Sequence, residues 1–254
     1  GQLWTVAFPP GARSRRARRQ KLTEEPPIID LSQEIYQGMP VYPGHLKTVI
    51  WTHLSHEECQ RQLSGQFSYE TRGILLCDHG PTHIDSISHL SRAPDAPSVD
   101  ELPLSSCITP GICLDVSDVA QKTQFGKAKI EAELARWKLA ITPGDSVLFY
   151  TAQCDRYYGS PEYMTDYPGL NREATEYIID QGCVNFGVDS PSPDMWYDKT
   201  YPCHSVCAER RIPHIENLCN LSKLLGKRFT FIALPLKIRK GTGSPVRAVA
   251  VLDR

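Results

Sequence analysis

A series of short apolar runs, several of them apolar on both faces, constrains the fold more than any other feature of the chain. Their length and their content of β-branched, leucine and aromatic residues are typical of buried β-strands. The runs occupy residues 27–31, 48–52, 72–76, 111–115, 146–150, 183–187, 229–234 and 246–252. Helical spacing of apolar residues is confined to 129–137, 171–181 and 204–211. The sequence therefore predicts a mixed α/β domain in which β-structure dominates.

A strongly basic run, Arg13-Ser14-Arg15-Arg16-Ala17-Arg18-Arg19, precedes the first strand-like segment. Blocks of like charge are usually solvated and disordered, so we interpret residues 1–24 as a flexible arm and 25–254 as a single domain. The alternative is an arm that binds nucleic acid or a protein partner. The net charge of -1 and the pI of about 6.8 provide no global attraction to nucleic acid or anionic membranes. We therefore expect neither as a partner.

The chain shows no sign of a membrane or secretory segment. No apolar stretch reaches the length of about 18 residues that a membrane-spanning helix needs, and no apolar segment follows the basic run. The nine cysteines are scattered and odd in number, unlike the framework of a small disulfide-bonded protein. The sequence predicts a cytoplasmic protein.

Three histidines and one aspartate lie within the eleven residues from His79 to His89. Imidazole nitrogens and carboxylate oxygens are common ligands of Zn²⁺, Mn²⁺ and Fe²⁺. A lone histidine beside a turn is more often a hydrogen-bonding residue than a ligand, but His79, His83 and Asp85 occur together. This density predicts a metal site.

The residues between these ligands indicate how they are presented. Gly80 and Pro81 disfavour a regular helix, so we expect a loop after the strand 72–76 to carry the ligands. A carboxylate can bind two ions through its two oxygens, which makes Asp85 the candidate for a shared ligand. Thr82 is expected either to orient a neighbouring ligand or to stabilise the turn.

A second group comprises Cys203 and His204, followed by His214 and Glu216. Cys203, His204 and Cys207 suggest a structural zinc site, but no further pair of cysteines completes a set of four ligands. We favour the alternative that both cysteines belong to the core, because free cysteine is among the most buried residue types.

The first group resembles the signature His-x-Gly-Thr-His-x-Asp-x-Pro-x-His of the kynurenine formamidase-like, or cyclase, family of metal hydrolases, with the same spacing. Pro81 replaces the signature glycine and Ile87 replaces the signature proline, which affects the shape of the loop and therefore the substrate. The resemblance continues through Asp30-Leu31-Ser32, residues 38–44, 143–145 and 187–192, His204, residues 216–218 and residues 241–248.

The resemblance implies roles for six residues. His79, His83 and Asp85 would bind one metal ion, His204 and Glu216 would join Asp85 around a second, and His89 would act as the acid/base. His214 matches no ligand in the pattern, and we interpret it as a neighbour of the site or a surface residue. The resemblance also implies a swivelling β/β/α fold and assembly into homodimers or homotetramers.

These observations predict an amidohydrolase that uses one or two ions of Zn²⁺ or Mn²⁺ to generate a metal-bound hydroxide. The leading substrate is N-formylkynurenine, cleaved to kynurenine and formate in tryptophan catabolism, and the alternative is ring opening of isatin, a lactam or an imide. A catalytically silent metal-binding scaffold would lack a ligand or the acid/base, yet all six positions are filled. No Gly-x-Ser-x-Gly motif supports a serine hydrolase. Five aromatic residues are candidates for an apolar pocket or for the core: Tyr42, Trp51, Phe67, Tyr69 and Trp196.

Overall fold

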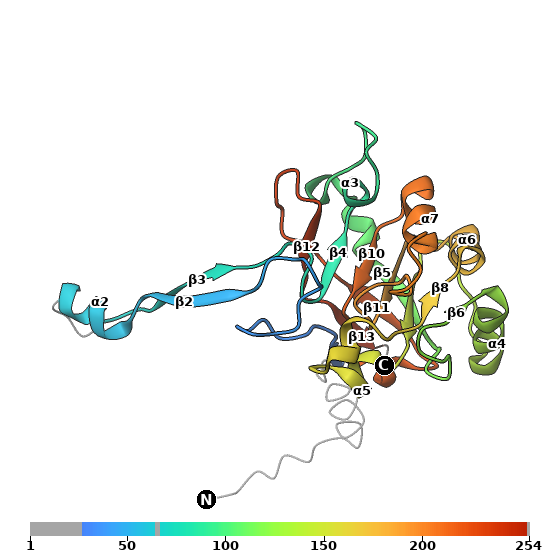
Figure 1. Cartoon of the computed structure of the whole chain (residues 1–254), viewed down its shortest axis with the longest axis horizontal. Helices are drawn as coiled ribbons and strands as arrows, with labels where there is room; N and C mark the ends of the chain where they lie inside the picture. The colour runs from blue at the N-terminus through green and yellow to red at the C-terminus, as the bar shows by residue number, and fades with distance from the viewer. Residues whose placement is uncertain (1–26, 64–66, 253–254) are drawn as a thin grey trace, which may run out of the picture.

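The computed structural model describes residues 27–63 and 67–252, so the predicted basic arm and its boundary lie outside the described residues. Its largest element is a curled sheet of nine strands (Figure 1). In spatial order these are β1 (Ile28–Asp30), β13 (Val249–Leu252), β11 (Arg228–Ile232), β5 (Ile108–Asp115), β7 (Ser146–Tyr150), β9 (Asn185–Val188), β10 (His214–Glu216), β4 (His83–Asp85) and β12 (Gly243–Pro245). The four central strands from β5 to β10 are parallel and the outer ones antiparallel, which confirms the mixed α/β class.

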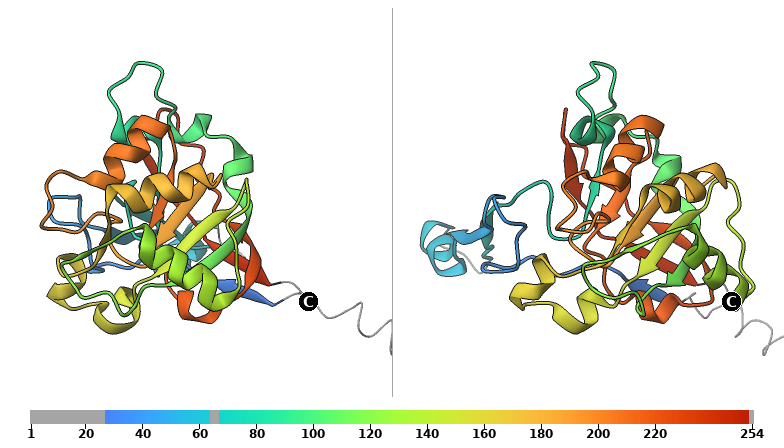
Figure 2. Two further views of the ribbon diagram at one scale, coloured as in Figure 1. Left: turned by 90° about the vertical axis from the view of Figure 1, so that its right-hand side faces the viewer. Right: turned by 45° about the vertical axis from the view of Figure 1, so that its right-hand side comes forward.

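Three helices cover one face of the sheet (Figure 2). They are α4 (Lys127–Trp137), α6 (Arg172–Asp180) and α7 (Pro202–Arg210), and they confirm the three predicted helical stretches with small shifts of their ends. Asn171 caps α6, because its side chain accepts a hydrogen bond from the amide of Ala174. Gly182 follows this helix at a φ of 94°, a conformation that glycine adopts without steric cost.

The central strands are buried on both faces, as the apolar runs predicted. On β7, Val147 and Phe149 point into the core beneath the helices, while Leu148 points into a second core on the other face. The remaining helices are α2 (His56–Leu63), α3 (Ile87–Leu90) and α5 (Gln153–Tyr157), with short 3₁₀ helices at 99–101, 104–106, 161–164 and 221–224. A separate two-stranded sheet pairs β6 (Gln124–Phe125) with β8 (Gly169–Leu170). None of the described helices has the length and apolar character needed to cross a bilayer.

The predicted strands 48–52 and 72–76 are confirmed, but they form a ribbon of their own. β2 (Val49–Leu54) and β3 (Thr71–Leu75) pair in antiparallel fashion, with α2 between them in the chain. The ribbon projects away from the large sheet and ends in α2, which the sequence did not predict (Figure 1). We call residues 49–75 the β-arm.

Candidate metal centre

Two adjacent strands bring four ligand-type side chains to one face of the sheet. β10 pairs with β4 so that His214 lies opposite Asp85 and Glu216 opposite His83. Side chains two residues apart in a strand share a face, and the isoleucine between them on each strand points into the opposite core. The predicted loop is therefore wrong for His83 and Asp85, which lie on a strand.

His79 does lie in the predicted loop, which leads into β4 through a cis Gly80–Pro81 bond. Its Nδ1 lies 2.7 Å from Oδ1 of Asp85, and its Nε2 lies 2.9 Å from the hydroxyl of Thr242. The ring packs directly on Gly243, where an added Cβ would lie 2.6 Å from Cε1 of His79. The close approach of β12 thus requires glycine at this position.

The structure brings together all the predicted metal ligands, in two clusters that share Asp85. Within each cluster the ligand atoms lie within 4.8 Å of one another. His214, which the sequence left as a neighbour or a surface residue, is fully buried in the second cluster, so the surface interpretation is wrong. The first cluster contains His79, His83 and Asp85, and the second contains Asp85, His204, His214 and Glu216.

Hydrogen bonds outside the clusters orient two of the histidines. Nδ1 of His83 lies 2.9 Å from the carbonyl oxygen of Pro81, and Nδ1 of His204 lies 2.5 Å from Oδ2 of Asp194. An imidazole that donates through Nδ1 to such an acceptor presents the lone pair of Nε2 to a metal ion. These two histidines thus fit a metal centre in ring orientation as well as in residue type.

Thr82 has the structural role rather than contact with a ligand. Its hydroxyl donates to the carbonyl oxygen of Asn217 and accepts from the amide of Gln33. These bonds tie the start of β4 to the chain that follows β10. Cys203 and Cys207 are buried in the core beneath the helices, as expected, and neither belongs to a ligand cluster of the described residues.

His89 stands on α3 beside the first cluster, and its side chain is 35% exposed. Its Nε2 lies 3.6 Å from Oδ2 of Asp85, and its ring centroid lies 4.0 Å from that of His79. Burial lowers the pKa of His89 below 6.5 and outweighs the opposing effect of Asp85. The imidazole is therefore neutral at neutral pH and able to accept a proton.

Without metal, the buried carboxylates are balanced by protonated imidazoles. Burial opposes the charge of His83, but hydrogen bonds to Asp85 and Glu216 raise its pKa to about 10. Burial and the charge of Asp85 would raise the pKa of Glu216, but hydrogen bonds from His214 and His83 lower it to about 2. Protons thus occupy the place where a metal ion would supply positive charge.

Metal binding is expected to release protons, because His83 must lose its proton before it can bind an ion. Apparent affinity should rise from pH 6.5 toward pH 10, by about tenfold per unit for each proton released, since the raised pKa keeps His83 charged over this range. Calorimetric titration with Zn²⁺ in buffers of different ionisation enthalpy measures the number of protons. A binding enthalpy that does not depend on the buffer would contradict this expectation.

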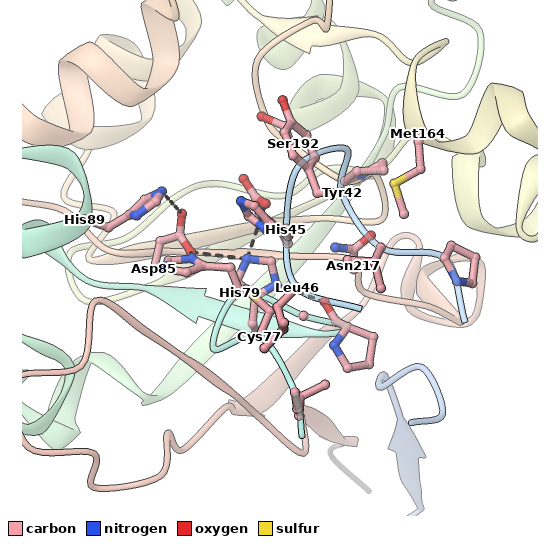
Figure 3. A pocket seen from close by; sticks show the side chains of 18 of the residues that line it. Tyr42, His45, Leu46, Cys77, His79, Asp85, His89, Met164, Ser192 and Asn217 are labelled. Carbon is pink, nitrogen blue, oxygen red and sulfur yellow. Dashed lines mark hydrogen bonds and ion pairs between the residues drawn. The ribbon is translucent and has the colours of Figure 1, made fainter. Parts of the chain in front are cut away.

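The clusters form the floor of a cavity of about 330 Å³. Figure 3 shows His89 directed toward Asp85, and Tyr42, Leu46 and Met164 also line the cavity. Of the aromatic residues considered for a pocket, Tyr42 lines the cavity and packs edge-on against Trp196. The other three, Trp51, Phe67 and Tyr69, are exposed on the β-arm. No lysine or arginine is among the described residues that line the cavity.

Comparisons with known proteins identify the family to which the chain belongs. A family model described as "Putative cyclase" matches residues 29–195. A kynurenine formamidase of Salinibacter ruber is 27% identical over 228 residues, which cover 87% of this chain and 96% of the relative. A kynurenine formamidase of Bacillus anthracis is 28% identical over 224 residues, which cover 87% of this chain and 95% of the relative.

Solved structures show the same fold. An isatin hydrolase bound to the product analogue thioisatinate superposes with a TM-score of 0.81 at 22% identity, covering 97% of this chain and all of the other. Isatin hydrolase A from Ralstonia solanacearum gives a TM-score of 0.78 at 23% identity, with 98% and 100% coverage. Because the family model spans well over half of the sequence and the fold agrees along nearly its whole length, the chain belongs to the cyclase family.

Proposed function

We propose that the protein is a metal-dependent amidohydrolase that cleaves a carbon–nitrogen amide bond, with an aryl formamide such as N-formylkynurenine as the leading substrate. The observation that carries this proposal is the pair of ligand clusters sharing Asp85 on the floor of a cavity, with a neutral histidine beside them. The curated relatives are kynurenine formamidases, which supports the choice of bond and substrate.

In this proposal His79, His83 and Asp85 hold one ion, and Asp85, His204 and Glu216 contribute to a second. Imidazole and carboxylate donors suit Zn²⁺ and Mn²⁺. When bound, the ions supply positive charge that polarises an amide carbonyl and acidifies a water molecule. The buried strands fix these donors, and the cavity walls hold the substrate above them.

His89 performs the proton transfers in this scheme. Its Nε2 faces the site, and its lowered pKa leaves it free to take a proton from the attacking water. The same nitrogen then returns the proton to the departing amide nitrogen. With 35% of its side chain exposed, His89 can also exchange protons with solvent between turnovers.

A specific observation favours a second candidate, the ring opening of a neutral cyclic amide such as isatin, a lactam or an imide. N-formylkynurenine carries an α-carboxylate, which usually pairs with arginine or lysine. No such residue lines the cavity in the described part of the chain, whereas apolar groups such as Met39, Val41 and Leu46 do. A flat, uncharged substrate suits this lining.

The test measures hydrolysis of N-formylkynurenine and of isatin by protein loaded with Zn²⁺ or Mn²⁺, with a chelated sample as control. Fast, chelator-sensitive release of formate would support an arylformamidase of tryptophan catabolism. Cleavage of isatin alone would select the cyclic amide. If neither amide is hydrolysed above the chelated background while metal is bound, the proposed function is wrong.

We further propose that the protein forms a homodimer or homotetramer in which a second copy covers the β-arm. A two-stranded ribbon alone is marginally stable in water, and large exposed apolar patches mark interfaces. On one face of the ribbon Val49, Trp51 and Leu75 are 42–49% exposed. Leu46 and Leu76, which flank the β-arm in the chain, line the cavity, so an arm held by a second copy would stabilise the cavity wall.

The double variant Trp51→Glu, Leu75→Glu is expected to be monomeric at micromolar concentration, because it places charges on the face formed by Val49, Trp51 and Leu75. Light scattering coupled to gel filtration measures the mass. Thr52→Glu, on the opposite face of the same strand, is the matched control and should keep the assembly. A monomeric parent protein would contradict the proposal.

A cytoplasmic location is likewise proposed, supported by the absence of a disulfide among the nine cysteines, all within the described residues.

A further inference from the structure

We infer that His214 is a direct ligand of the second metal ion, which gives that ion four protein ligands and leaves the first ion with three. The inference rests on the proposed metal centre. It assigns a role to a residue that the family signature does not include. It also distinguishes a second position closed by protein ligands from a first position that stays open.

The backbone places His214 among the ligands. It lies directly opposite Asp85 in the pairing of β10 with β4, just as Glu216 lies opposite His83. Directly opposed residues on one face of an antiparallel pair have Cβ atoms about 4.5–5.5 Å apart. The four side chains therefore form two adjacent cross-strand pairs, and His214 has the same relation to Asp85 as Glu216 has to His83.

The ligand atoms have the separation that a shared ion requires. Nε2 of His214 lies 3.5 Å from Oδ2 of Asp85 and 3.3 Å from Oε1 of Glu216. Two ligands at about 2.0–2.2 Å from one tetrahedral ion lie about 3.3–3.6 Å apart. Nε2 of His204 lies 4.0 and 3.7 Å from the same two oxygens. By this measure His214 fits the second position at least as well as His204.

The surroundings fix the direction of the His214 ring. The ring is fully buried and stacks on Phe186 with 14° between the two ring planes. It meets the ring of His204 edge-on, with 4.8 Å between the ring centroids. Nε2 points at the two carboxylates. Nδ1 has no hydrogen-bond partner of normal geometry among the described residues, although the Cys207 thiol lies beside the ring. The packing of the ring thus leaves Nε2 as the nitrogen that faces the site.

The number of protein ligands then distinguishes the two positions. Structural metal sites are usually closed by four protein ligands, whereas catalytic sites have three and an open position. With His214 included, Asp85, His204, His214 and Glu216 close the second position. The first position, with His79, His83 and Asp85, stays open toward the cavity and His89. His214 itself does not line the cavity, as expected for a ligand that approaches from beneath.

The experiment compares the parent protein with His214→Gln in titrations with Zn²⁺, read by calorimetry and by metal analysis after dialysis. We expect two ions in the parent and, in the variant, at least about a 100-fold loss of affinity for the second ion only. X-ray absorption on the doubly loaded parent should show an average of two imidazoles per ion, because four histidines serve two ions. His45→Gln is the matched control, since His45 lines the cavity outside both clusters.

Three results would overturn the inference. The first is a variant that keeps both ions at parental affinity. The second is a parent with three imidazoles for two ions, and the third is a parent that binds a single ion at saturating metal. Because the imidazole count uses the parent protein alone, it decides the matter even if His214→Gln does not fold. The proposed function is tested separately by chelator-sensitive amide cleavage, which would leave that function intact whichever residues bind the second ion.

Discussion

Replacing His89 with alanine is expected to lower kcat by about 10²–10⁴-fold, the usual contribution of a general acid/base, while the protein keeps its metal. His89 faces Asp85 at 3.6 Å but belongs to neither ligand cluster. Its loss therefore removes the proton carrier and leaves the donors in place. Steady-state kinetics and metal analysis on the same preparation measure both effects.

The pH dependence provides an independent check of this role. In the parent, kcat/KM should fall in acid as His89 becomes protonated, with an apparent pKa below 6.5 because burial disfavours the charged form. The alanine variant should lose this acid limb. His45→Ala is the control, because that imidazole lines the same cavity without contacting Asp85. Loss of metal in step with activity would show that His89 supports the ions instead of transferring protons.

Most of the central sheet and all three major helices could be predicted from the sequence. β5 and β7 contain apolar runs, Ile112–Leu114 and Val147–Tyr150, and all four residues of β9 are buried, because the sheet is covered on both faces. The helices α4 and α6 have clear apolar spacing and, for α6, a capping asparagine. Such elements can be recognised from local sequence, because the apolar pattern that buries each of them lies within its own residues.

The strands that carry the site could not be predicted in this way. β4, β10 and β12 have three residues each, and two of them place histidine and carboxylate side chains where a strand of the core would place apolar ones. On these two strands, only Ile84 and Ile215 are apolar residues that point into the hydrophobic core. A metal site needs this exception, because its ligands must be buried and polar at once.

A short sequence pattern indicates that His214 belongs to the site. His214-Ile215-Glu216 has the same alternation of ligand, isoleucine and ligand as His83-Ile84-Asp85. Two segments of this kind, each with an apolar residue between two donors, indicate paired strands with a shared polar face. The separation of the β-arm from the large sheet could not be predicted, because β2 and β3 have the composition of ordinary strands but pair with each other.

The second large effect is expected from Asp85→Asn, which should reduce hydrolysis to the background of the chelated enzyme. Asp85 is the only residue common to both clusters, with Oδ1 beside His79 and His83 and Oδ2 beside His214. An amide offers one neutral oxygen in place of two charged ones, so both metal positions are weakened together. Metal content after dialysis should fall from two ions to less than one.

The variant should still fold, which makes the measurement interpretable. Removing one partner of a buried ion pair costs about 3–5 kcal/mol when the other charge stays behind, but His83 can lose its proton instead. Asp189→Asn is the matched control: burial raises the pKa of Asp189 to about 7, so the amide resembles its neutral form, and its carboxylate accepts hydrogen bonds from the amide and hydroxyl of Thr151. This control should keep both ions. If Asp85→Asn retained two ions as well, a shared aspartate could not be the link between the two positions, and the centre would have to be built from separate sites.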